Sequence, residues 1–352
     1  MTDPAINAPS GATSAGAASP AAPVAEAPVQ ARATPRNQWW DVWDQFRTHR
    51  GALLGLACFL LIVVMVVLGP LLWRLDATFI DIRAKNTRHI VACFGLDWGA
   101  IISCFLNPAE AEGLKVSWAH PLGTDQLGRD ILARMISGGQ VSLAVGMTAM
   151  ALALIVGTGI GVLAGYFKRL DGLLMRFTDL FLALPLLPLL LVIIMLFRDP
   201  LRAAFGPAEG IFILIVFVIG ITSWMQTARI VRGDVLALKE REFVLAARSI
   251  GTPSRRMVTR HILPNVMSPI MVSATLGIAN AIITESALSF LGLGFPSDFP
   301  TWGRLLFDGT DYLQQYPERV VWPGVFISLA VLSVNYIGDG LRDALDPRIR
   351  GR

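Results

Sequence analysis

The sequence predicts an all-α membrane protein with six transmembrane helices. Of its 352 residues, 54% are hydrophobic and only 16% are charged, whereas an ordinary soluble domain carries about 25% charged residues. The chain also contains 32 glycines and 21 prolines, which can divide a long apolar sequence into separate spans. No region alternates apolar and polar residues over successive segments of about ten residues, as a membrane β-barrel would. These observations exclude an ordinary soluble enzyme and favour helices over a barrel.

The N-terminal part is predicted to lie outside the membrane core. Residues 1–36 are rich in alanine and proline and contain few side chains large enough to pack, so they are expected to form a disordered tail. Residues 37–50 place three tryptophans and a phenylalanine at offsets of three and four among charged residues. This pattern is typical of an amphipathic helix in the headgroup layer, and an extension of the first span would fit it equally well.

Six segments have the ~20 mainly apolar residues that a helix needs to cross the hydrocarbon layer. They cover residues 51–73, 141–167, 177–197, 209–228, 266–291 and 320–340. With the N-terminus inside, most lysines and arginines of the short connecting segments fall on the inner side. The positive-inside rule therefore predicts that both termini, including the tail 341–352, are cytoplasmic and that residues 141–340 form a five-helix core.

Residues 74–140 are predicted to form an outer loop. Within it, residues 90–106 are apolar enough to compete as a seventh span. Asp97 near the centre of that stretch would cost about 2.5–3.5 kcal/mol in the membrane, and a seventh span would also place the basic segment 229–264 outside. The stretch is therefore expected to be a folded part of the loop.

Cys93 and Cys104 are the two cysteines of this outer loop. They could form a disulfide if the loop faces an oxidising compartment. A continuous helix would hold positions eleven residues apart about 16 Å from each other, which is too far for a disulfide. Gly95 and Gly99 could break that helix, so a disulfide and two free, half-buried cysteines both remain open. The cysteines and histidines are otherwise scattered, and the sequence predicts no metal site.

The segment 229–264 carries the most information about function. Phe243, Ala246, Ala247 and Ile250 recur at helical spacing and form one apolar stripe, which is predicted to be a docking surface. The small alanines would let another backbone approach closely.

Local signals divide this segment into two helices. Asp234 is expected to cap the first helix, and Gly251 suits a left-handed end. Thr252 and Pro253 are expected to begin a second helix that ends before Pro264.

In this segment two alanines, a glycine and a leucine–proline pair have a spacing that resembles that of the EAA loop of ABC-importer permeases. The residues are Ala246, Ala247, Gly251, Leu263 and Pro264. Leu245 stands where this motif usually has glutamate, and His261 stands where it usually has isoleucine. The docking role is still expected, without the contact that the usual glutamate would make.

Further motifs resemble the second permease subunit of dipeptide, oligopeptide and nickel importers. The sequence HPLGTDQLGRDILAR at 120–134 is similar to the family's signature before the second span. Residues 285–294, 301–303 and 338–347 are similar to the same family. The resemblance runs from about residue 45 to residue 352, with residues 86–112 as a long insertion in the outer loop.

This resemblance implies an ABC importer type I permease fold in the bacterial cytoplasmic (inner) membrane, with the outer loop in the periplasm. It implies a translocation path shared with a second homologous permease, two ATP-binding subunits docked on the cytoplasmic segment, and a periplasmic solute-binding protein. Di- or oligopeptides are the expected solutes. ATP and magnesium would be bound by the partner subunits, because the chain has no G-x-x-x-x-G-K-[ST] motif. The chain is therefore expected to be neither an enzyme nor a cofactor-binding protein.

Other functions fit the sequence less well. An ion-gradient-driven secondary transporter is the alternative, but such proteins usually show paired repeats and interrupted helices at corresponding positions, which are not visible here. Nucleic acid is not an expected partner, because the basic residues are not clustered with aromatic residues. Lipid is the expected environment of the spans.

Several polar and small residues near the spans are compatible with either a structural or a functional role. Glu285 could line the translocation path or make a structural hydrogen bond to a neighbouring helix. Glycines at 157, 161 and 165 are predicted to allow close helix packing. Asp125 with Arg129, and Asp130 with Arg134, are expected to form ion pairs along a helix surface.

Overall fold

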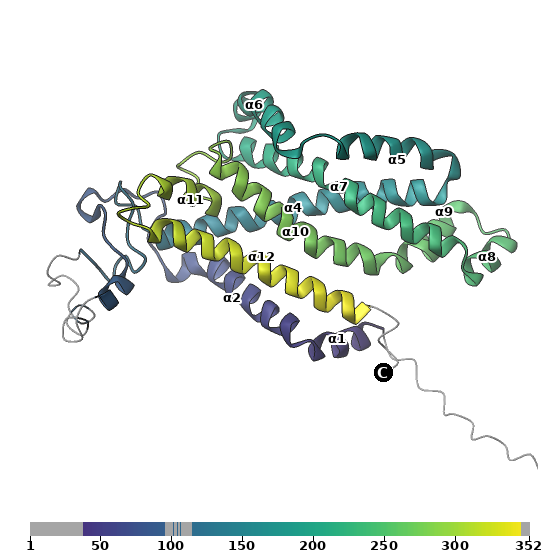
Figure 1. The fold of residues 1–352 in the computed structure, drawn as a ribbon, viewed down its shortest axis with the longest axis horizontal. Helices are drawn as coiled ribbons and strands as arrows, with labels where there is room; N and C mark the ends of the chain where they lie inside the picture. The colour runs from purple at the N-terminus through teal and green to yellow at the C-terminus, as the bar shows by residue number, and fades with distance from the viewer. Residues whose placement is uncertain (1–37, 96–100, 102–103, 105, 107–114, 346–352) are drawn as a thin grey trace, which may run out of the picture. The chain divides into compact units, whose positions relative to one another are not determined.

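The computed structural model describes residues 38–95, 101, 104, 106 and 115–345, and Figure 1 shows its helices. The tail expected at 1–36 and the last residues of the expected tail 341–352 lie outside this range. In the described part, helices dominate and the β-structure consists of isolated bridges. An all-α fold is therefore confirmed for the described residues.

The chain begins with a separate amphipathic helix. Helix α1 (Gln38–Thr48) ends just before α2 (Arg50–Leu72), and His49 between them accepts a hydrogen bond at Nδ1 from the backbone N–H of Ala52, over 3.0 Å. One face of α1 is buried against α2 and the end of α12, while Trp40 and Trp43 are exposed on the other face. Because an extended residue separates the two helices, α1 is not a continuous extension of the first span.

Two long helices form the centre of the bundle. Helices α4 (Ile131–Tyr166) and α7 (Glu209–Lys239) pack along each other, and Gly157, Gly161 and Gly165 of α4 face α7. A Cβ atom at any of these glycines would come within 2.6–2.7 Å of an α7 atom. The predicted close packing through small residues is confirmed.

The segment expected as one span at 177–197 is sharply bent. The structure has α5 (Lys168–Leu182) and α6 (Leu186–Phe205), joined by a bend of 86°. Pro185 lies at the break, where its ring disfavours a helical conformation of the residue before it and its nitrogen cannot donate a helical hydrogen bond. Figure 1 shows α5 running beside the long helices, and after the bend Leu190 and Ile194 of α6 pack against α7.

The C-terminal third completes the bundle. Helices α10 (Met267–Phe290) and α12 (Glu318–Leu345) flank α2 and α4, and the short helix α11 (Trp302–Thr310) lies between them in sequence. Trp302 at the start of α11 is fully buried and donates from Nε1 to the carbonyl oxygen of Met135 over 2.9 Å. This contact fixes α11 against the first turns of α4.

Five described helices are long and apolar enough to cross a membrane, and the number is six if the α5–α6 pair counts as one broken span. Helix α1, the end of α12 and α8 (Glu242–Ser249) lie toward one end of the bundle, which we call the α8 end. Helix α11 and the loop after α2 lie toward the other, which we call the α11 end (Figure 1).

The loop after α2 is folded onto the α11 end. Its described part contains short 3₁₀ helices, η1 (Ile82–Ala84) and η2 (Ile90–Gly95), and no candidate span covers the described residues of 90–106. Cys93 and Cys104 form a disulfide with their Cα atoms 5.9 Å apart, which is the first of the two open alternatives.

Candidate functional site

The segment after α7 forms a helix of its own, α8, at the α8 end. Helix α7 continues without a break to Lys239, so Asp234 lies inside it and the expected N-cap at Asp234 is wrong. A turn at Glu240 and Arg241 then separates α7 from α8, with Arg241 as the N-cap residue. Periodicity alone could not locate this turn, because the charged residues of α7 continue the helical pattern up to it.

Gly251 ends α8 as predicted. Its φ of +79° lies in the left-handed region that favours glycine, and no neighbouring atom among the described residues would collide with a Cβ there. The N–H of Thr252 donates to the carbonyl of Ala247 and the N–H of Gly251 donates to that of Arg248. This is a Schellman motif, which fixes the direction in which the chain leaves α8.

The second part of the segment differs from the expected helix. Pro253, and not Thr252, precedes the first helical residue of α9 (Ser254–Arg256). A π-helical turn, η4 (Met257–Ile262), and a 3₁₀ turn, η5 (Leu263–Asn265), follow directly. The helical backbone therefore includes Pro264 instead of ending before it, because a proline early in a new turn needs no hydrogen-bond donor.

The predicted apolar stripe is divided between two faces of α8. Ala247 is buried together with Val244 in a cluster with α4, α7 and the start of α10. Phe243, Ala246 and Ile250 are exposed, and we call these three residues the exposed face of α8. Ala247 thus holds α8 on the bundle, whereas Ala246 is available to another protein.

Lys239, the last residue of α7 before the turn into α8, connects the end of α7 to the end of α4. The Lys239 ammonium donates to the backbone carbonyls of Gly165 over 3.1 Å and Tyr166 over 3.0 Å, and it lies 5.8 Å from the centre of the Tyr166 ring. These carbonyls belong to the last turn of α4, which lacks helical donors of its own. These contacts join the ends of the two central helices directly before the turn into α8.

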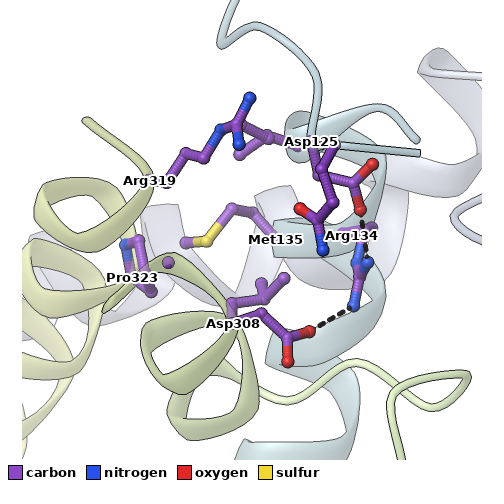
Figure 2. A pocket seen from close by; sticks show the side chains of 10 residues that line it. Asp125, Arg134, Met135, Asp308, Arg319 and Pro323 are labelled. Carbon is purple, nitrogen blue, oxygen red and sulfur yellow. Dashed lines mark hydrogen bonds and ion pairs between the residues drawn. The ribbon is translucent and has the colours of Figure 1, made fainter. Parts of the chain in front are cut away.

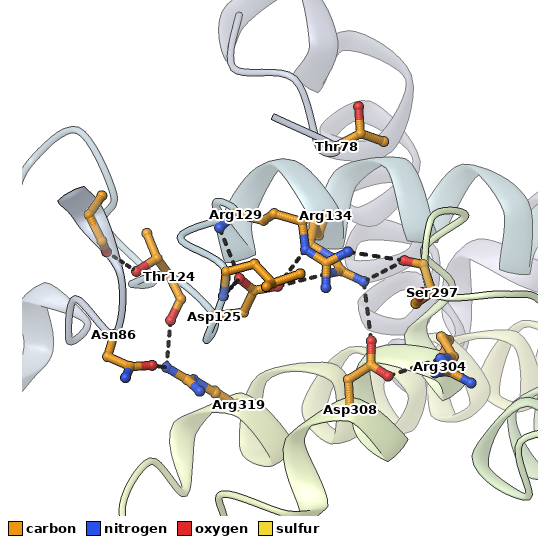
Figure 3. A network of polar contacts seen from close by, with 12 residues as sticks. Thr78, Asn86, Thr124, Asp125, Arg129, Arg134, Ser297, Arg304, Asp308 and Arg319 are labelled. Carbon is orange, nitrogen blue, oxygen red and sulfur yellow. Dashed lines mark hydrogen bonds and ion pairs between the residues drawn. The ribbon is translucent and has the colours of Figure 1, made fainter. Parts of the chain in front are cut away.

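A buried ionic network occupies the α11 end (Figure 3). We call it the outer polar network, and its charged members are Asp125, Arg129, Arg134, Arg304, Asp308 and Arg319. Asp125 Oδ2 accepts from Arg129 Nε over 2.6 Å and from Arg134 Nη1 over 2.8 Å. Arg134 Nη2 also donates to Asp308 Oδ2 over 3.3 Å. The network thus joins the loop before α4 to α11.

Asp125 and Arg129 pair as predicted, but in the loop before α4 and not along a helix surface, and the predicted pair of Asp130 and Arg134 is wrong. Asp130 is the N-cap of α4 and accepts from the Ala133 N–H over 2.8 Å. It also accepts from Trp73 Nε1 over 2.8 Å and lies 3.0 Å from His120 Nδ1. Because the Asp130 carboxylate caps α4 and contacts Trp73 and His120, Arg134 pairs with Asp125 and Asp308 instead.

Asp125 is held in its ionised form. Burial raises the pKa of its carboxyl, but hydrogen bonding from the Arg129 backbone and the positive charges of Arg129 and Arg134 outweigh burial. The pKa of Asp125 therefore lies below its ordinary value. The stability that its ion pairs contribute is present above the ordinary aspartate pKa of about 3.9 and is lost only as pH falls through the lower folded value.

Glu285 of α10 is fully buried near the α11 end. Its carboxylate accepts from Ser142 Oγ on α4 over 3.0 Å and from Ser289 Oγ over 2.7 Å. The backbone N–H of Trp302 donates to the same Ser142 hydroxyl over 3.3 Å. Within this chain Glu285 makes the hydrogen bond to a neighbouring helix that was one of its two expected roles, while a role in the translocation path stays a prediction.

Sequence reasoning did not identify Asp308, Arg304 and Arg319 as members of the outer polar network. Arg319 Nη2 donates to Asn86 Oδ1 and to the Thr124 carbonyl, each over 2.8 Å. These partners are far apart in sequence, and no local pattern connects them. The only available signal was the presence of charges beside apolar spans.

The fold and these sites define a multi-pass helical membrane protein. Its α8 end carries an exposed apolar helix face on a basic segment, and this arrangement is suited to a membrane permease that docks another protein. Two family models match the chain. The binding-protein-dependent transport system inner membrane component model matches residues 157–351, and the model for the N-terminal transmembrane domain of oligopeptide transport permease C matches residues 37–88.

Individual relatives cover nearly the whole chain. The oligopeptide transport system permease protein OppC of Bacillus subtilis strain 168 is 36% identical, over 89% of this chain and 90% of the relative. The dipeptide transport system permease protein DppC of Alkalihalophilus pseudofirmus is 34% identical, over 92% of this chain and 94% of the relative. Among solved structures, the inward-facing MetNI methionine ABC transporter matches 60% of this chain and 96% of its own, at 17% identity and a TM-score of 0.49.

The chain belongs to the family of binding-protein-dependent transport system inner membrane components. It is accordingly a multi-pass membrane permease, as the sequence motifs indicated.

Proposed function

We propose that the chain is a permease subunit of an ATP-driven, binding-protein-dependent importer of di- or oligopeptides. It would form the translocation path with a second homologous permease and receive solute from a periplasmic binding protein. Two ATP-binding subunits, which hold ATP and magnesium, would dock on the exposed face of α8. The names of the relatives support the solute class.

The exposed face of α8 is the observation that carries this proposal. Phe243, Ala246 and Ile250 present apolar surface at the end of the bundle, beside the basic residues of the segment. The buried side of the same helix packs against α4, α7 and α10, and Lys239 at the end of α7 joins α7 to α4. A docked subunit could therefore move the central helices. A permease without its own nucleotide site requires such a coupling to a partner that hydrolyses ATP.

Peptide uptake tests the function. Deleting the gene for this chain is expected to abolish accumulation of a labelled dipeptide or tripeptide and to leave uptake of the free amino acids unchanged. Uptake restored by the wild-type chain should stop when cellular ATP is depleted and should persist when an ionophore collapses the ion gradients while ATP is maintained. Uptake that follows the ion gradient would support the secondary-transporter alternative instead.

The orientation of the chain is also part of the proposal: the α8 end would be cytoplasmic and the α11 end periplasmic. Ile82 and Ile250 are matched probes, since they lie at opposite ends and are 77% and 84% exposed. In a Cys58→Ser background, we expect a membrane-impermeant maleimide to label Ile82→Cys in intact cells and to label Ile250→Cys only after permeabilisation. The opposite pattern would reverse the topology.

A further inference from the structure

The cavity inside the outer polar network is too small for an organic ligand. Figure 2 shows it lined by residues of α4, α11 and α12, and its volume is about 20 Å³. A water molecule needs roughly 10–15 Å³, so this cavity has room for one such molecule. It therefore provides no site for a larger ligand.

A larger cavity, of about 210 Å³, lies between the end of α2 and the start of α4, and we call it the α2–α4 pocket. Pro70 and Trp73 line it from the end of α2, and Ala133, Ile136 and Ser137 line it from α4. Within each set the residues are three or four positions apart, so one face of each helix forms a wall. Sites for whole small molecules measure roughly 300–1,000 Å³, so this pocket suits one group of a larger ligand.

The tryptophan in this pocket is held in place by a buried carboxylate. Trp73 Nε1 donates to Asp130 Oδ2 over 2.8 Å, and Asp130 is only 3% exposed. The same oxygen accepts from the backbone N–H of Ala133 at the start of α4, also over 2.8 Å. The two walls of the α2–α4 pocket are therefore fixed to each other.

The segment after α2 brings one positive and one negative residue to the pocket. Arg74 and Asp76 both line it and are exposed, and neither forms an ion pair with any residue that the structure describes. Asp76 Oδ1 accepts from the backbone N–H and the hydroxyl of Thr78, each over 2.8 Å, which leaves Oδ2 as a further acceptor. The backbone hydrogen bond from Thr78, and then that from its hydroxyl, lower the pKa of Asp76, so the carboxylate is ionised at neutral pH. The pocket therefore offers a guanidinium to an anion and a carboxylate oxygen to a cation.

Apolar surface lies directly beside these charges. Leu71 and Leu72, in the last turn of α2, are 72% and 82% exposed. Because α2 is long and apolar enough to cross a membrane, these side chains meet lipid where the helix leaves the hydrocarbon layer. Tryptophan and arginine, here Trp73 and Arg74, are typical anchors at that boundary. A ligand with a polar group for the pocket and apolar chains for the leucines is an amphiphile.

We propose that the α2–α4 pocket binds the headgroup of a phospholipid that carries both a phosphate and a primary ammonium group, as phosphatidylethanolamine does. The phosphate accepts hydrogen bonds from the Arg74 guanidinium, and the ammonium donates to Asp76 Oδ2. The acyl chains lie along Leu71 and Leu72. The bound lipid stabilises the contact between α2 and α4 and is distinct from any transported solute.

Lipid-dependent stability tests the proposal. The thermal unfolding midpoint of the full-length chain, purified in detergent, is measured with added phosphatidylethanolamine, phosphatidylcholine or phosphatidylglycerol of identical acyl chains. We expect a saturable rise at the lowest concentration of phosphatidylethanolamine, because the choline group has no proton to donate to Asp76 and the glycerol group has no positive charge. Equal responses to the three lipids would overturn the proposal. An equal response to free phosphoethanolamine, which has no acyl chains, would overturn the assignment to a lipid.

Matched variants separate the pocket from general lipid effects. Arg74→Gln should raise the half-saturating concentration of phosphatidylethanolamine roughly tenfold, because a charge-assisted hydrogen bond to phosphate is lost. Asp76→Asn keeps an oxygen for Thr78 but removes the negative charge, so the preference for phosphatidylethanolamine over phosphatidylglycerol should disappear. Arg83→Gln changes an exposed arginine of the same loop that does not line the pocket, and it should leave both results unchanged. All three side chains are exposed, so the variants should fold. An Asp76→Asn chain that keeps the full preference would contradict the assignment.

Discussion

Replacing Ala246 with arginine is expected to reduce peptide uptake at least about tenfold while leaving the protein folded and inserted. Ala246 is exposed on α8, and arginine is a good helix former, so the free energy of unfolding should change by less than about 0.5 kcal/mol. A bulky charge would prevent close approach of a docked subunit. Loss of only about 1.4 kcal/mol of docking free energy already weakens association tenfold.

Two measurements check this result. Uptake of a labelled dipeptide gives the functional loss, and co-purification gives the loss of associated ATPase subunits. Arg248→Ala is a matched control, since Arg248 is exposed on the same helix about 160° around the axis from Ala246. Normal uptake and association in Ala246→Arg would place the docking surface elsewhere.

Ala247 is expected to behave differently from its neighbour. Its side chain is buried with Val244 against the bundle, so Ala247→Arg should lower the amount of folded protein instead of uncoupling it. The two substitutions therefore distinguish docking from packing. The sequence placed both alanines on one surface because a short helix with several small and apolar residues has no single apolar face.

The sequence was sufficient where one local signal determined the structure. The apolar lengths located most spans, the four-residue glycine spacing indicated the face that α4 presents to α7, and Gly251 marked the end of α8. Each depends on residues a few positions apart, for which helix geometry and backbone conformation give direct rules.

The sequence was insufficient where distant residues or competing local signals determined the structure. The bend at Pro185 divided an apolar run that satisfied the length criterion for one span. Arg134 pairs with Asp308, a partner 174 residues away in the chain, whereas the spacing rule suggested Asp130. Helix α4 begins at Ile131, so Asp130 caps the N-terminus of the helix. Arg134 is therefore available to pair with Asp308 on another helix.

The outer polar network is expected to be the most sensitive part of the α11 end to mutation. Asp125→Ala should lower the free energy of unfolding by about 3–5 kcal/mol, because removing one partner of a buried ion pair leaves the other charge uncompensated. Here two arginines and two backbone N–H groups would lose their acceptor at once. Thermal unfolding of the purified protein in detergent would measure the change at neutral pH.

Asp179→Asn provides the control for this experiment. Asp179 pairs with Arg229, but the two side chains are 59% and 52% exposed, so the loss should be below about 1 kcal/mol. The lowered pKa of Asp125 adds a second criterion. The stability that the Asp125 carboxylate contributes should stay constant from about pH 8 to pH 5, because this carboxyl remains ionised in both the folded and the unfolded chain over that range. The stability difference between wild type and Asp125→Ala should therefore be the same at both pH values and should shrink only in stronger acid. Equal small losses in the two variants would mean that solvent reaches the outer polar network and screens its charges.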